Sequence, residues 1–501
     1  DVCSSDLLKD FLMVSRRRLL QAALLTALLP ASLVQAVARA QSRNTFQVPP
    51  LYTGRKEGKD RYFDLQVQSG SAEIIPGYQT PTLGINQPFL GVTLRANRGE
   101  RLYFTVENRL PKETTLHWHG MKLPARADGG PHQPIAPGAV WNSEFTIQQP
   151  AATLWYHSHQ LHQTGVQVYH GLAGLFLIDD EESQRLNLPS TYGIDDFPVI
   201  IQDRDFNRDG TLQYLTTMRD RMMGKRGGTI LVNGVVSPLL KVEKPLIRLR
   251  LLNGANARIY RLEFDDHRPF KVIGSDGGLL EQSRDARSVI LAPGERAEIL
   301  VDLSAGGVPI LRHRPHNQRS PQREMSMMQR MMGEQDQFDI FQIDATGVES
   351  KPVALPTYLV KSSVDRSLPV QAERTMNLQM MMNPARFLMR DQFAINGKSM
   401  KMSRIDEVVN AGAVEIWKIN NHTMMPHPFH IHNVQFQIIK RDGQREPHEF
   451  GFKDTVLVHP KESVILRIQF PKHRDPHTPY MYHCHILEHE DQGMMGQFVV
   501  V

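Results

Sequence analysis

Cysteine is almost absent from this chain. Among its 501 residues only Cys3 and Cys484 are cysteines. Cys3 lies in an N-terminal segment that we expect to be removed on export, so the mature chain cannot form an internal disulfide. A single thiol is most often a buried, inert side chain, but the neighbours of Cys484 in the sequence indicate a different role.

A strong charge of either sign is also missing. The chain has 58 lysines and arginines against 53 aspartates and glutamates. These are not gathered into one block, which excludes nucleic acid as the expected partner. With 41% hydrophobic and 22% charged residues, the composition is that of an ordinary soluble fold. The length is too great for one hydrophobic core and predicts three domains of roughly 100 to 200 residues each.

The N-terminus is the one strongly biased segment. The residues SRRRLL at 15–20 lead into an apolar run to Val37, which ends at ARA (38–40). This order predicts an export signal of the twin-arginine type with cleavage after Ala40. A membrane anchor is disfavoured, because the run contains glutamines and a proline and ends in a small-x-small site instead of a charged stop-transfer flank. We expect residues 1–40 to be an extension and signal peptide, and the protein to be periplasmic without stable membrane association.

One strand-like pattern occurs three times, alternating apolar and polar residues and ending in asparagine. The copies are GERLYFTVEN at 99–108, KPLIRLRLLN at 244–253 and GAVEIWKINN at 412–421. A turn followed by another alternating segment recurs after each copy. The turns are Pro137-Gly138, Pro293-Gly294 and Pro460-Lys461. The repeats predict an all-β protein with three copies of one Greek-key sandwich or barrel domain.

Strand-like endings and a linker rich in proline and serine near 346–372 place the domain boundaries. We expect domain 1 at 41–182, domain 2 at 183–350 and domain 3 at 351–501. Domain 2 has none of the paired histidines found in the other two. Its expected role is therefore that of a spacer that holds domains 1 and 3 in register.

Ten of the 21 histidines fall in four short clusters. On a strand, residues i and i+2 point to the same face, so each His-x-His pair offers two neighbouring imidazoles to metal ions. A single histidine is better explained as a hydrogen-bonded core residue, but ten at these spacings indicate a metal site. The clusters are His117-Trp118-His119, His157-Ser158-His159, His427-Pro428-Phe429-His430-Ile431-His432, and His483-Cys484-His485 followed by His489 and Met494.

Strand parity predicts two kinds of site joined by adjacent residues. His483 and His485 share one face of their strand, while Cys484 between them points to the other. A metal held by Cys484 would therefore lie across the strand from metals held by the two histidines.

The Cys484 side of the strand has a further set of candidate ligands. His427 has the opposite parity to the two histidines that follow it, so it can join Cys484 if its segment is extended. His489 and Met494 then complete two imidazoles, one thiolate and one weak thioether, the ligand set of a blue-copper site suited to one-electron transfer. Structural zinc is disfavoured, because it prefers four tight Cys or His ligands and no methionine.

The motifs HWHG, HSH, HPFHIH and HCHILEHEDQGMM resemble, in order, the four copper-binding signatures of multicopper oxidases. The resemblance extends over nearly the whole mature chain and implies three cupredoxin-like domains with four copper ions. It implies a type 1 copper, a type 2 copper and a type 3 pair. The ligands of the type 1 copper would be His427, Cys484, His489 and Met494. The ligands of the type 2 copper would be His117 and His430. In the type 3 pair, one ion would take His119, His157 and His485, and the other His159, His432 and His483. No ligand is missing, which matters because some relatives have lost their copper and serve as structural proteins.

The resemblance also implies a reaction. Electrons from a reducing substrate would enter at the type 1 copper, cross through Cys484 to its flanking histidines, and reduce O2 to water. Protons would come from Asp128, which matches an acid beside the type 2 copper, and from Glu490, which matches one on the O2 side. The alternative for each is a turn-stabilising or surface carboxylate.

Methionine is in excess and bears on the substrate. Either of two groups could collect Cu(I) near the type 1 site, because soft sulfur selects Cu(I), unless the group packs as core. The first group, at helical spacing, would form one soft face. It contains Met325, Met327, Met328, Met331 and Met332. A second group contains Met376, Met380, Met381, Met382 and Met389.

The pattern departs from the copper-efflux members of the family in two ways. Those members carry a Met- and His-rich insertion that is absent here, and an acidic residue where this chain has Thr423. We therefore expect the partners to be O2 and small electron donors, namely phenols, aromatic amines or Cu(I). We expect the protein to be a monomer. A dedicated cuprous oxidase is the alternative. A copper-binding scaffold without turnover and a copper nitrite reductase are disfavoured.

Overall fold

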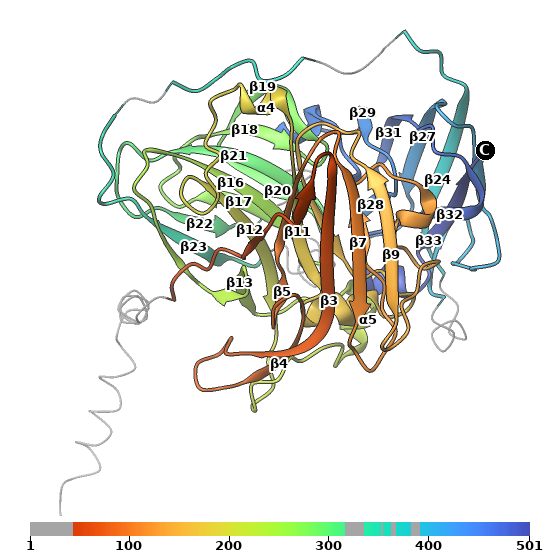
Figure 1. Cartoon of the computed structure of the whole chain (residues 1–501), viewed down its shortest axis with the longest axis horizontal. Helices are drawn as coiled ribbons and strands as arrows, with labels where there is room; N and C mark the ends of the chain where they lie inside the picture. The colour runs from red at the N-terminus through yellow and green to blue at the C-terminus, as the bar shows by residue number, and fades with distance from the viewer. Residues whose placement is uncertain (1–43, 316–334, 352–353, 362–366, 382–390) are drawn as a thin grey trace, which may run out of the picture. The chain divides into compact units, whose positions relative to one another are not determined.

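The computed structural model describes residues 44–315, 335–351, 354–361, 367–381 and 391–501. The predicted export segment, the first methionine group (325–332), and Met382 and Met389 lie outside these ranges. From Thr45 to Val501 the chain forms one compact unit built mainly from β-strands (Figure 1). Within the described ranges no helix has the length and apolar character needed to cross a membrane.

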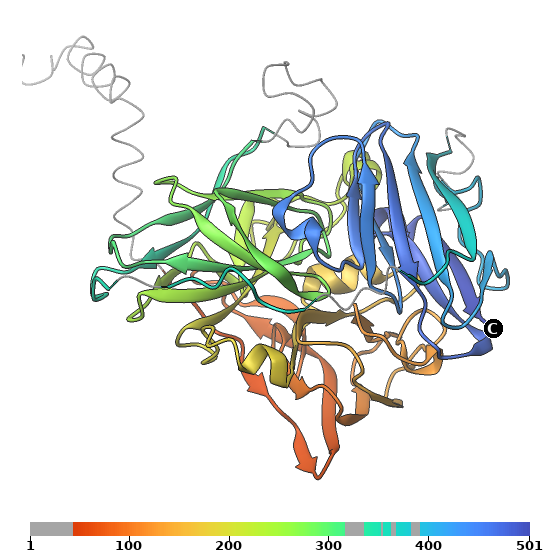
Figure 2. The same ribbon diagram turned by 90° about the horizontal axis from the view of Figure 1, so that it is seen from above.

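Six sheets form three pairs, and the strands of each pair come from one stretch of the chain. This is three β-sandwiches in sequence, which confirms the predicted all-β class. Each pair of sheets borders the other two (Figure 2). The last strands of the three stretches end at Asp179, Asp344 and Val500. Among the described residues no sheet therefore crosses a predicted domain boundary, although the boundaries themselves stay predictions.

Domain 1 has one sheet in the order β1-β6-β11-β10-β8 and a second in the order β5-β4-β3-β7-β9, with β2 on β3. Its strands are β1 (Leu51–Tyr52), β2 (Arg55–Glu57), β3 (Asp60–Ala72), β4 (Thr80–Ile85), β5 (Leu90–Gly91), β6 (Thr93–Asn97), β7 (Arg101–Asn108), β8 (His117–His119), β9 (Val140–Thr146), β10 (Ala152–His157) and β11 (Ala173–Asp179). The short helices are η1 (Ala125–Ala127), α3 (Thr164–His170) and α4 (Glu181–Gln184).

Domain 2 pairs a sheet in the order β14-β13-β12-β16-β21-β18-β19 with one in the order β15-β23-β22-β17-β20. Its strands are β12 (Asp196–Arg204), β13 (Thr229–Val232), β14 (Val235–Val236), β15 (Leu239–Lys241), β16 (Leu246–Asn253), β17 (Tyr260–Phe264), β18 (Phe270–Ser275), β19 (Gly278–Ala286), β20 (Ser288–Leu291), β21 (Arg296–Asp302), β22 (Ile310–His313) and β23 (Phe338–Asp344). Its helix is α5 (Met218–Met223).

Domain 3 pairs a sheet in the order β25-β24-β27-β31-β29 with one in the order β26-β33-β32-β28-β30. Its strands are β24 (Ala372–Met380), β25 (Phe393–Ile395), β26 (Glu407–Val409), β27 (Val414–Asn421), β28 (His427–Ile431), β29 (Phe436–Arg441), β30 (Thr455–Val458), β31 (Ser463–Gln469), β32 (Asp475–Cys484) and β33 (Met495–Val500). The helices are η2 (Pro447–Phe450) and α8 (Leu487–Asp491).

The asparagine that ends each sequence repeat closes the same corner in every domain. The Asn108 side chain donates to the carbonyl oxygens of Lys112 (2.9 Å) and Ile135 (2.7 Å), and its Oδ1 accepts from the Leu110 N–H. Equivalent bonds join Asn253 to Arg258, Leu291 and Ala255, and Asn421 to Met425, Val458 and Thr423. The sequence repeat is therefore a repeated set of buried hydrogen bonds.

The turn that follows each asparagine is also repeated. The backbone N–H groups of Gly138, Gly294 and Lys461 donate to the carbonyl oxygens of the three asparagines at 2.8, 2.9 and 3.0 Å. All three turn residues have positive φ, of 74°, 85° and 63°. Glycine adopts this conformation without steric cost, whereas domain 3 places a lysine there.

The hydrophobic core clusters do not correspond one to one to the three pairs of sheets. One core cluster runs through domains 1 and 3 and includes Phe104, Trp118, Trp417 and Tyr482. A second cluster fills domain 2. Continuous packing between domains 1 and 3 fixes the strands that carry the histidine pairs with respect to each other.

Three short helices meet where the domains join, because α8 of domain 3 contacts both α3 of domain 1 and α5 of domain 2. The buried Glu488 on α8 accepts hydrogen bonds from the Tyr214 hydroxyl (2.9 Å), the Asn256 amide (2.8 Å) and the Lys225 backbone N–H (3.0 Å). These bonds anchor the helix that carries His489 and Glu490.

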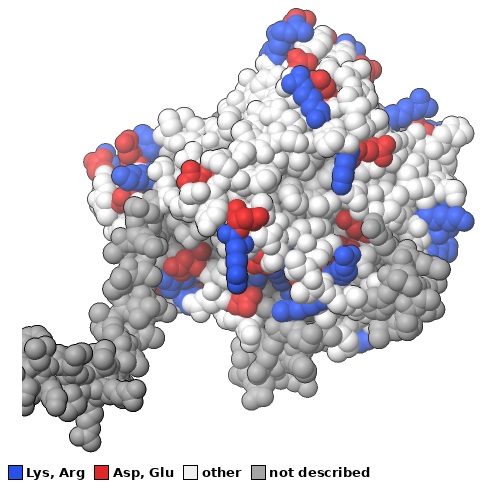
Figure 3. Space-filling view, turned by 90° about the horizontal axis from the view of Figure 1, so that it is seen from below, with Lys and Arg blue, Asp and Glu red and all other residues white. Residues whose placement is uncertain are grey.

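The charged side chains on one face of the molecule are scattered, with uncharged surface between them (Figure 3). Among the described residues that face the viewer there, no continuous patch of one sign forms. This face therefore offers no concentrated field that would attract a highly charged partner.

Candidate metal centres

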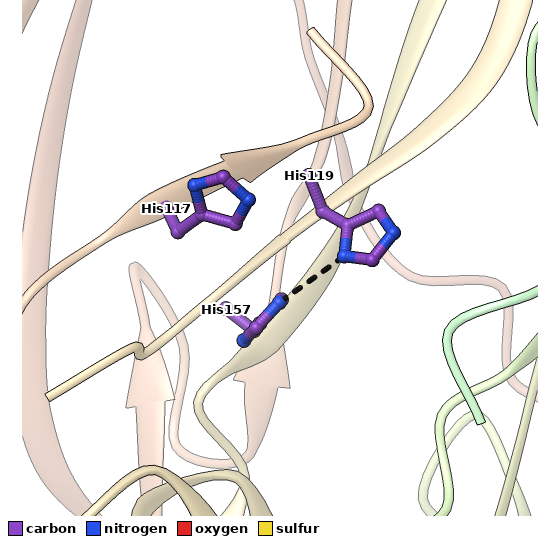
Figure 4. Close-up of side chains that lie close together, drawn as sticks. All are labelled: His117, His119 and His157. Carbon is purple, nitrogen blue, oxygen red and sulfur yellow. Dashed lines mark hydrogen bonds between the residues drawn. The ribbon is translucent and has the colours of Figure 1, made fainter. Parts of the chain in front are cut away.

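The first two histidine pairs come from neighbouring antiparallel strands. In the register of β8 and β10, His117 lies opposite His157, and His119 opposite Trp155. The side chains of His117, His119 and His157 lie close together, with Nε2 of His157 3.4 Å from Nδ1 of His119 (Figure 4). Period-two alternation on paired strands produces this gathering, as the spacing predicts.

The last two clusters meet in the same way in domain 3. In the register of β28 and β32, His430 lies opposite His483 and Phe429 opposite Cys484. Alternation then places His427 on the face of Cys484, away from His430 and His483. The two strands therefore separate these side chains onto two faces, His427 with Cys484 and His430 with His483, as the alternation in the sequence predicts.

Eight histidines of domains 1 and 3 form one buried group, here called the histidine cluster. The His117 ring stacks on that of His432 with centroids 3.8 Å apart, and His119 stacks on His430 at 3.7 Å. Each ring is at most 1% exposed. The members are His117, His119, His157, His159, His430, His432, His483 and His485.

The ring nitrogens that point into the cluster converge on one another. Nε2 of His483 lies 3.1 Å from Nε2 of His159 and 3.2 Å from Nε2 of His432. These three histidines offer ligand atoms that all lie within 4.8 Å of one another, as do His117, His430 and His432, and also His117, His119 and His157. The ring centre of His485 lies 5.0 Å from that of His119 and 5.3 Å from that of His157.

Several nitrogens of the cluster are buried without a hydrogen-bond partner. Among them are Nε2 of His117, Nε2 of His430 and both ring nitrogens of His485. Burying a polar atom without a partner is costly, and a metal ion would satisfy these atoms. Burial lowers the pKa of His157, His430 and His485 well below the imidazole value, and the neighbouring histidines lower it further. These rings are therefore neutral near pH 7 and have a lone pair to offer a cation.

The outward nitrogens of the cluster are bound to the protein. Nδ1 of His117, His157 and His430 lies at 2.8 to 2.9 Å from the carbonyl oxygens of Asp128, Ser158 and Asp454 respectively. A histidine whose Nδ1–H donates in this way presents Nε2 as a lone pair. Such contacts are typical of histidines that bind metal ions.

Asp128 and Glu490, the two acids singled out in the sequence, both reach the histidine cluster and are almost fully buried. The Asp128 carboxylate is 2.7 Å from Nδ1 of His432. The Glu490 carboxylate approaches Nδ1 of His159 at 3.3 Å and Nδ1 of His483 at 3.2 Å. Burial raises the pKa of Glu490, but the positive charge that the two rings can carry outweighs it and holds the pKa at about 2. Neither acid is a surface carboxylate.

The second site, here called the cysteine site, consists of His427, Cys484 and His489. Nδ1 of His427 lies 3.4 Å, and Nδ1 of His489 3.7 Å, from the Cys484 sulfur. Burial raises the pKa of the Cys484 thiol, so a thiolate here requires a bound cation. Met494, the predicted fourth ligand, is fully buried, and its backbone oxygen accepts the Cys484 N–H at 3.0 Å.

The outer nitrogens of the cysteine site are also held. Nε2 of His427 lies 2.8 Å from the Thr423 hydroxyl, and Nε2 of His489 lies 3.0 Å from the backbone oxygen of Met222. Both histidines therefore direct Nδ1 towards the sulfur. Met222 belongs to α5 of domain 2, so the spacer domain contributes to this site.

Two features of the site were not predicted from the sequence. One is Asp454, whose carboxylate lies 3.0 Å from Nε2 of His119. The other is a methionine group, here called the α5 methionine group, in which Met222 and Met223 pack with Met425 and with Met380. Of these four, Met380 alone belongs to a group singled out in the sequence. The spacing of Asp454 carries no signal, but three methionines within the six residues MRDRMM of α5 could have been noticed. Met376 of the second sequence group is fully buried packing.

The buried cysteine site and the histidine cluster beside it offer several groups of side chains that could hold metal ions. Models of the multicopper oxidase family match residues 66–183 and 369–501. Taken with the relatives described next, these matches show that the chain belongs to the multicopper oxidase family.

The relatives include both oxidases and a division protein. Multicopper oxidase mco of Staphylococcus haemolyticus is 35% identical over 92% of this chain and 93% of its own. Cell division protein FtsP of Xenorhabdus nematophila is also 35% identical, over 97% of this chain and 98% of its own. Among solved structures, the laccase-like multi-copper oxidase CueO of the lignin-degrading bacterium Ochrobactrum sp. is 36% identical, with a TM-score of 0.80, over 91% of this chain and all of that one. The cupredoxin-like architecture expected for the three domains is thereby confirmed.

Proposed function

We propose that this protein is an active multicopper oxidase that couples one-electron oxidation of phenolic or aromatic donors, or of Cu(I), to the four-electron reduction of O2 to water. The observation that carries this proposal is the complete buried donor set: one cysteine and ten histidines whose ring nitrogens converge in two groups.

Four copper ions would fit these residues. A type 1 copper would be held by His427, Cys484, His489 and Met494, supported by the two Nδ1 atoms directed at the sulfur. A type 2 copper would be held by His117 and His430, supported by their unpartnered Nε2 atoms. A type 3 pair would take the other six histidines, His159, His432 and His483 on one ion and His119, His157 and His485 on the other.

Bound copper would supply one-electron redox chemistry and binding of O2. Residues of the chain would connect the two sites and exchange protons. Cys484 and its neighbours His483 and His485 link the two sites through a few covalent bonds. Asp128 and Glu490 orient histidine rings and are placed to exchange protons at the cluster.

The likeness to FtsP makes a scaffold without turnover the competing function. The complete donor set favours the oxidase, because a scaffold needs no unpartnered buried imidazoles. The deciding experiment is copper content together with O2 uptake by the copper-loaded protein, with a methoxyphenol and, separately, Cu(I) as donor and with Cys484→Ser as control. The oxidase requires about four copper ions per chain and uptake that Cys484→Ser abolishes. Copper binding without any O2 uptake would establish the scaffold.

The α5 methionine group favours Cu(I) as a second donor. Met222 contacts His489 of the cysteine site through its backbone oxygen, and Met223 and Met425 pack with Met222. Soft thioethers prefer Cu(I). The first methionine group of the sequence (325–332) stays a prediction, since it lies outside the described residues. We further propose that the protein is exported, by the twin-arginine signal at 1–40, and acts in the periplasm as a monomer.

A further inference from the structure

Domain 2 supplies no histidine to the histidine cluster, yet its repeated turn reaches it. Gly294 lies against the His485 ring so closely that an added Cβ would be 3.0 Å from the ring's Cδ2. The equivalent Gly138 of domain 1 has nothing within 4 Å of the same position. Two residues after Gly294, Arg296 begins β21 and is fully buried.

The Arg296 guanidinium uses all five of its N–H donors. Two reach the Asp454 carboxylate of domain 3 as a fork, Nη1 to Oδ1 at 2.7 Å and Nη2 to Oδ2 at 2.6 Å. Nε donates to the Thr153 carbonyl of domain 1 at 3.0 Å. The remaining two donate to the carbonyls of Gly294 (2.8 Å) and Asp276 (3.0 Å) within domain 2. One side chain therefore joins all three domains.

Asp454, which Arg296 holds, in turn contacts two histidines of the histidine cluster. Its Oδ1 accepts from Nε2 of His119 at 3.0 Å, and its backbone oxygen accepts from Nδ1 of His430 at 2.8 Å. The other carboxylate oxygen is held by Gln435 (3.1 Å) as well as by Arg296. The carboxylate is thus fixed in one orientation by partners that do not bind metal.

His119 is oriented in the reverse sense to most of the cluster. Nδ1 of His117, His157 and His430 donates outward, whereas His119 donates Nε2–H outward and directs Nδ1 inward, 3.4 Å from Nε2 of His157. A histidine with Nε2–H on a carboxylate has its lone pair on Nδ1. The Asp454 contact therefore selects the nitrogen that His119 can offer to a metal.

We propose that Arg296 is a positioning residue for the histidine cluster: by holding Asp454 as a fork, it fixes the tautomer and ring orientation of His119. Domain 2 is then part of the metal centre and more than a spacer. This inference rests on the proposed function for its copper readout, but the His119 tautomer can be measured without metal.

The test compares Arg296→Gln and Arg296→Lys with Arg250→Gln. Arg250 is a matched control because it is also buried, pairs with Asp196 (2.7 and 2.9 Å) and bonds to Thr153 of domain 1 (2.9 Å). Arg296→Lys keeps the charge but loses the fork, and it serves where Arg296→Gln does not fold, because breaking a buried ion pair destabilises a protein strongly.

Two readouts are needed. The first readout is the His119 tautomer, measured by NMR in metal-free protein labelled with 15N-histidine, with His119→Gln used to assign the signal. Wild type and Arg250→Gln should show His119 protonated on Nε2. The Arg296 variants should show a mixture of tautomers. In copper-loaded protein, the Arg296 variants should bind copper in the cluster roughly 10- to 100-fold more weakly, while Arg250→Gln keeps its copper and every variant keeps the blue absorption of the cysteine site.

An unchanged His119 tautomer in both Arg296 variants would overturn the inference. Equal copper loss in Arg250→Gln at an equal drop in melting temperature would also overturn it, since general destabilisation would then explain the effect. If wild type binds no copper, the proposed function fails, and the tautomer measurement alone decides the role of Arg296.

Discussion

The Thr423 hydroxyl lies 2.8 Å from Nε2 of His427, and this contact leaves Nδ1 of the same ring 3.4 Å from the Cys484 sulfur. The neutral hydroxyl can accept the Nε2–H of His427 while its own proton goes to Oδ1 of Asn421 (2.8 Å) or to the Met425 carbonyl (3.0 Å).

Replacing Thr423 by valine should weaken copper binding at the cysteine site. The valine cannot accept the Nε2–H, so the His427 ring loses its orientation, and loss of such an outer contact typically weakens metal binding roughly 10- to 100-fold. Thr423→Ser keeps the hydroxyl and is the control. Loss of blue absorption during titration with a chelator measures the effect; equal curves for the two variants would show that the contact does not hold the ring.

The repeated asparagines allow a comparison between domains. Asn421→Ala and Asn108→Ala remove equivalent pairs of hydrogen bonds to carbonyl oxygens. Each should lower the free energy of unfolding by roughly 2 to 6 kcal/mol, at about 1–3 kcal/mol for each of the two carbonyl groups. Only Asn421 also supports Thr423. We therefore expect Asn421→Ala alone to lower copper retention at the cysteine site. Matching copper retention in the two variants would separate the repeat corner from metal binding.

Gly294 and Gly138 make a second matched pair. Alanine at either position is strained, because φ is +85° and +74°, which costs roughly 1–2 kcal/mol for an L-residue. At Gly294 the new methyl group would also press on the His485 ring. Gly294→Ala should therefore lose copper from the histidine cluster, whereas Gly138→Ala should lose stability alone. The copper content of the two variants after dialysis distinguishes these outcomes, provided that both variants have the same melting temperature.

The buried Glu298 predicts a pH-dependent stability. Burial raises its pKa, but Arg248 and Arg250 outweigh burial and lower it from 4.5 to about 2. The folded state therefore binds fewer protons than the unfolded state between these values. The stabilisation, on the order of 3 kcal/mol, is complete above pH 4.5 and is lost as the pH falls towards 2.

Glu298→Gln should accordingly have a lower melting temperature than wild type at pH 7, and the difference should shrink between pH 4.5 and 2. Glu349→Gln is the control, since the Glu349 side chain is 70% exposed. Parallel melting curves of wild type and Glu298→Gln over this pH range would contradict the prediction. Metal-free protein should be used, so that protonation of the histidine cluster affects all three proteins alike.

The α5 methionine group gives a prediction about the donor. The double variant Met223→Leu and Met425→Leu keeps volume and apolar character but removes two thioethers near the cysteine site. O2 uptake with Cu(I) should fall several-fold, while uptake with a methoxyphenol should change by less than about twofold. A parallel fall with both donors would show that the two methionines act only as packing.

Much of this arrangement could be predicted because it follows from strand alternation. The separation of Cys484 from His483 and His485, and the place of His427 on the Cys484 face, need only period-two geometry. The repeated asparagines likewise marked three equivalent strands. The ligand assignments themselves came from a family resemblance and stay proposals.

The unpredicted part depends on contacts between domains. Arg296 lies 158 residues from Asp454 along the chain, and Asp454 lies 335 residues from His119. No local pattern indicates such partners, because they are brought together only by the packing of separate sandwiches. The methionines of α5 could have been noticed in the sequence, but the contact of Met222 with His489 depends on packing between domains 2 and 3 and has no local signal.

The burial of Cys484 has a practical consequence. A chain that begins at Thr45 has no other thiol, and this one is fully enclosed. A maleimide or an aromatic disulfide reagent should therefore leave the folded protein unmodified and label it only after domain 3 opens around β32 and α8. The labelling rate would measure how often that opening occurs, and its slowing by copper would report how firmly the metal closes the domain, without any engineered cysteine.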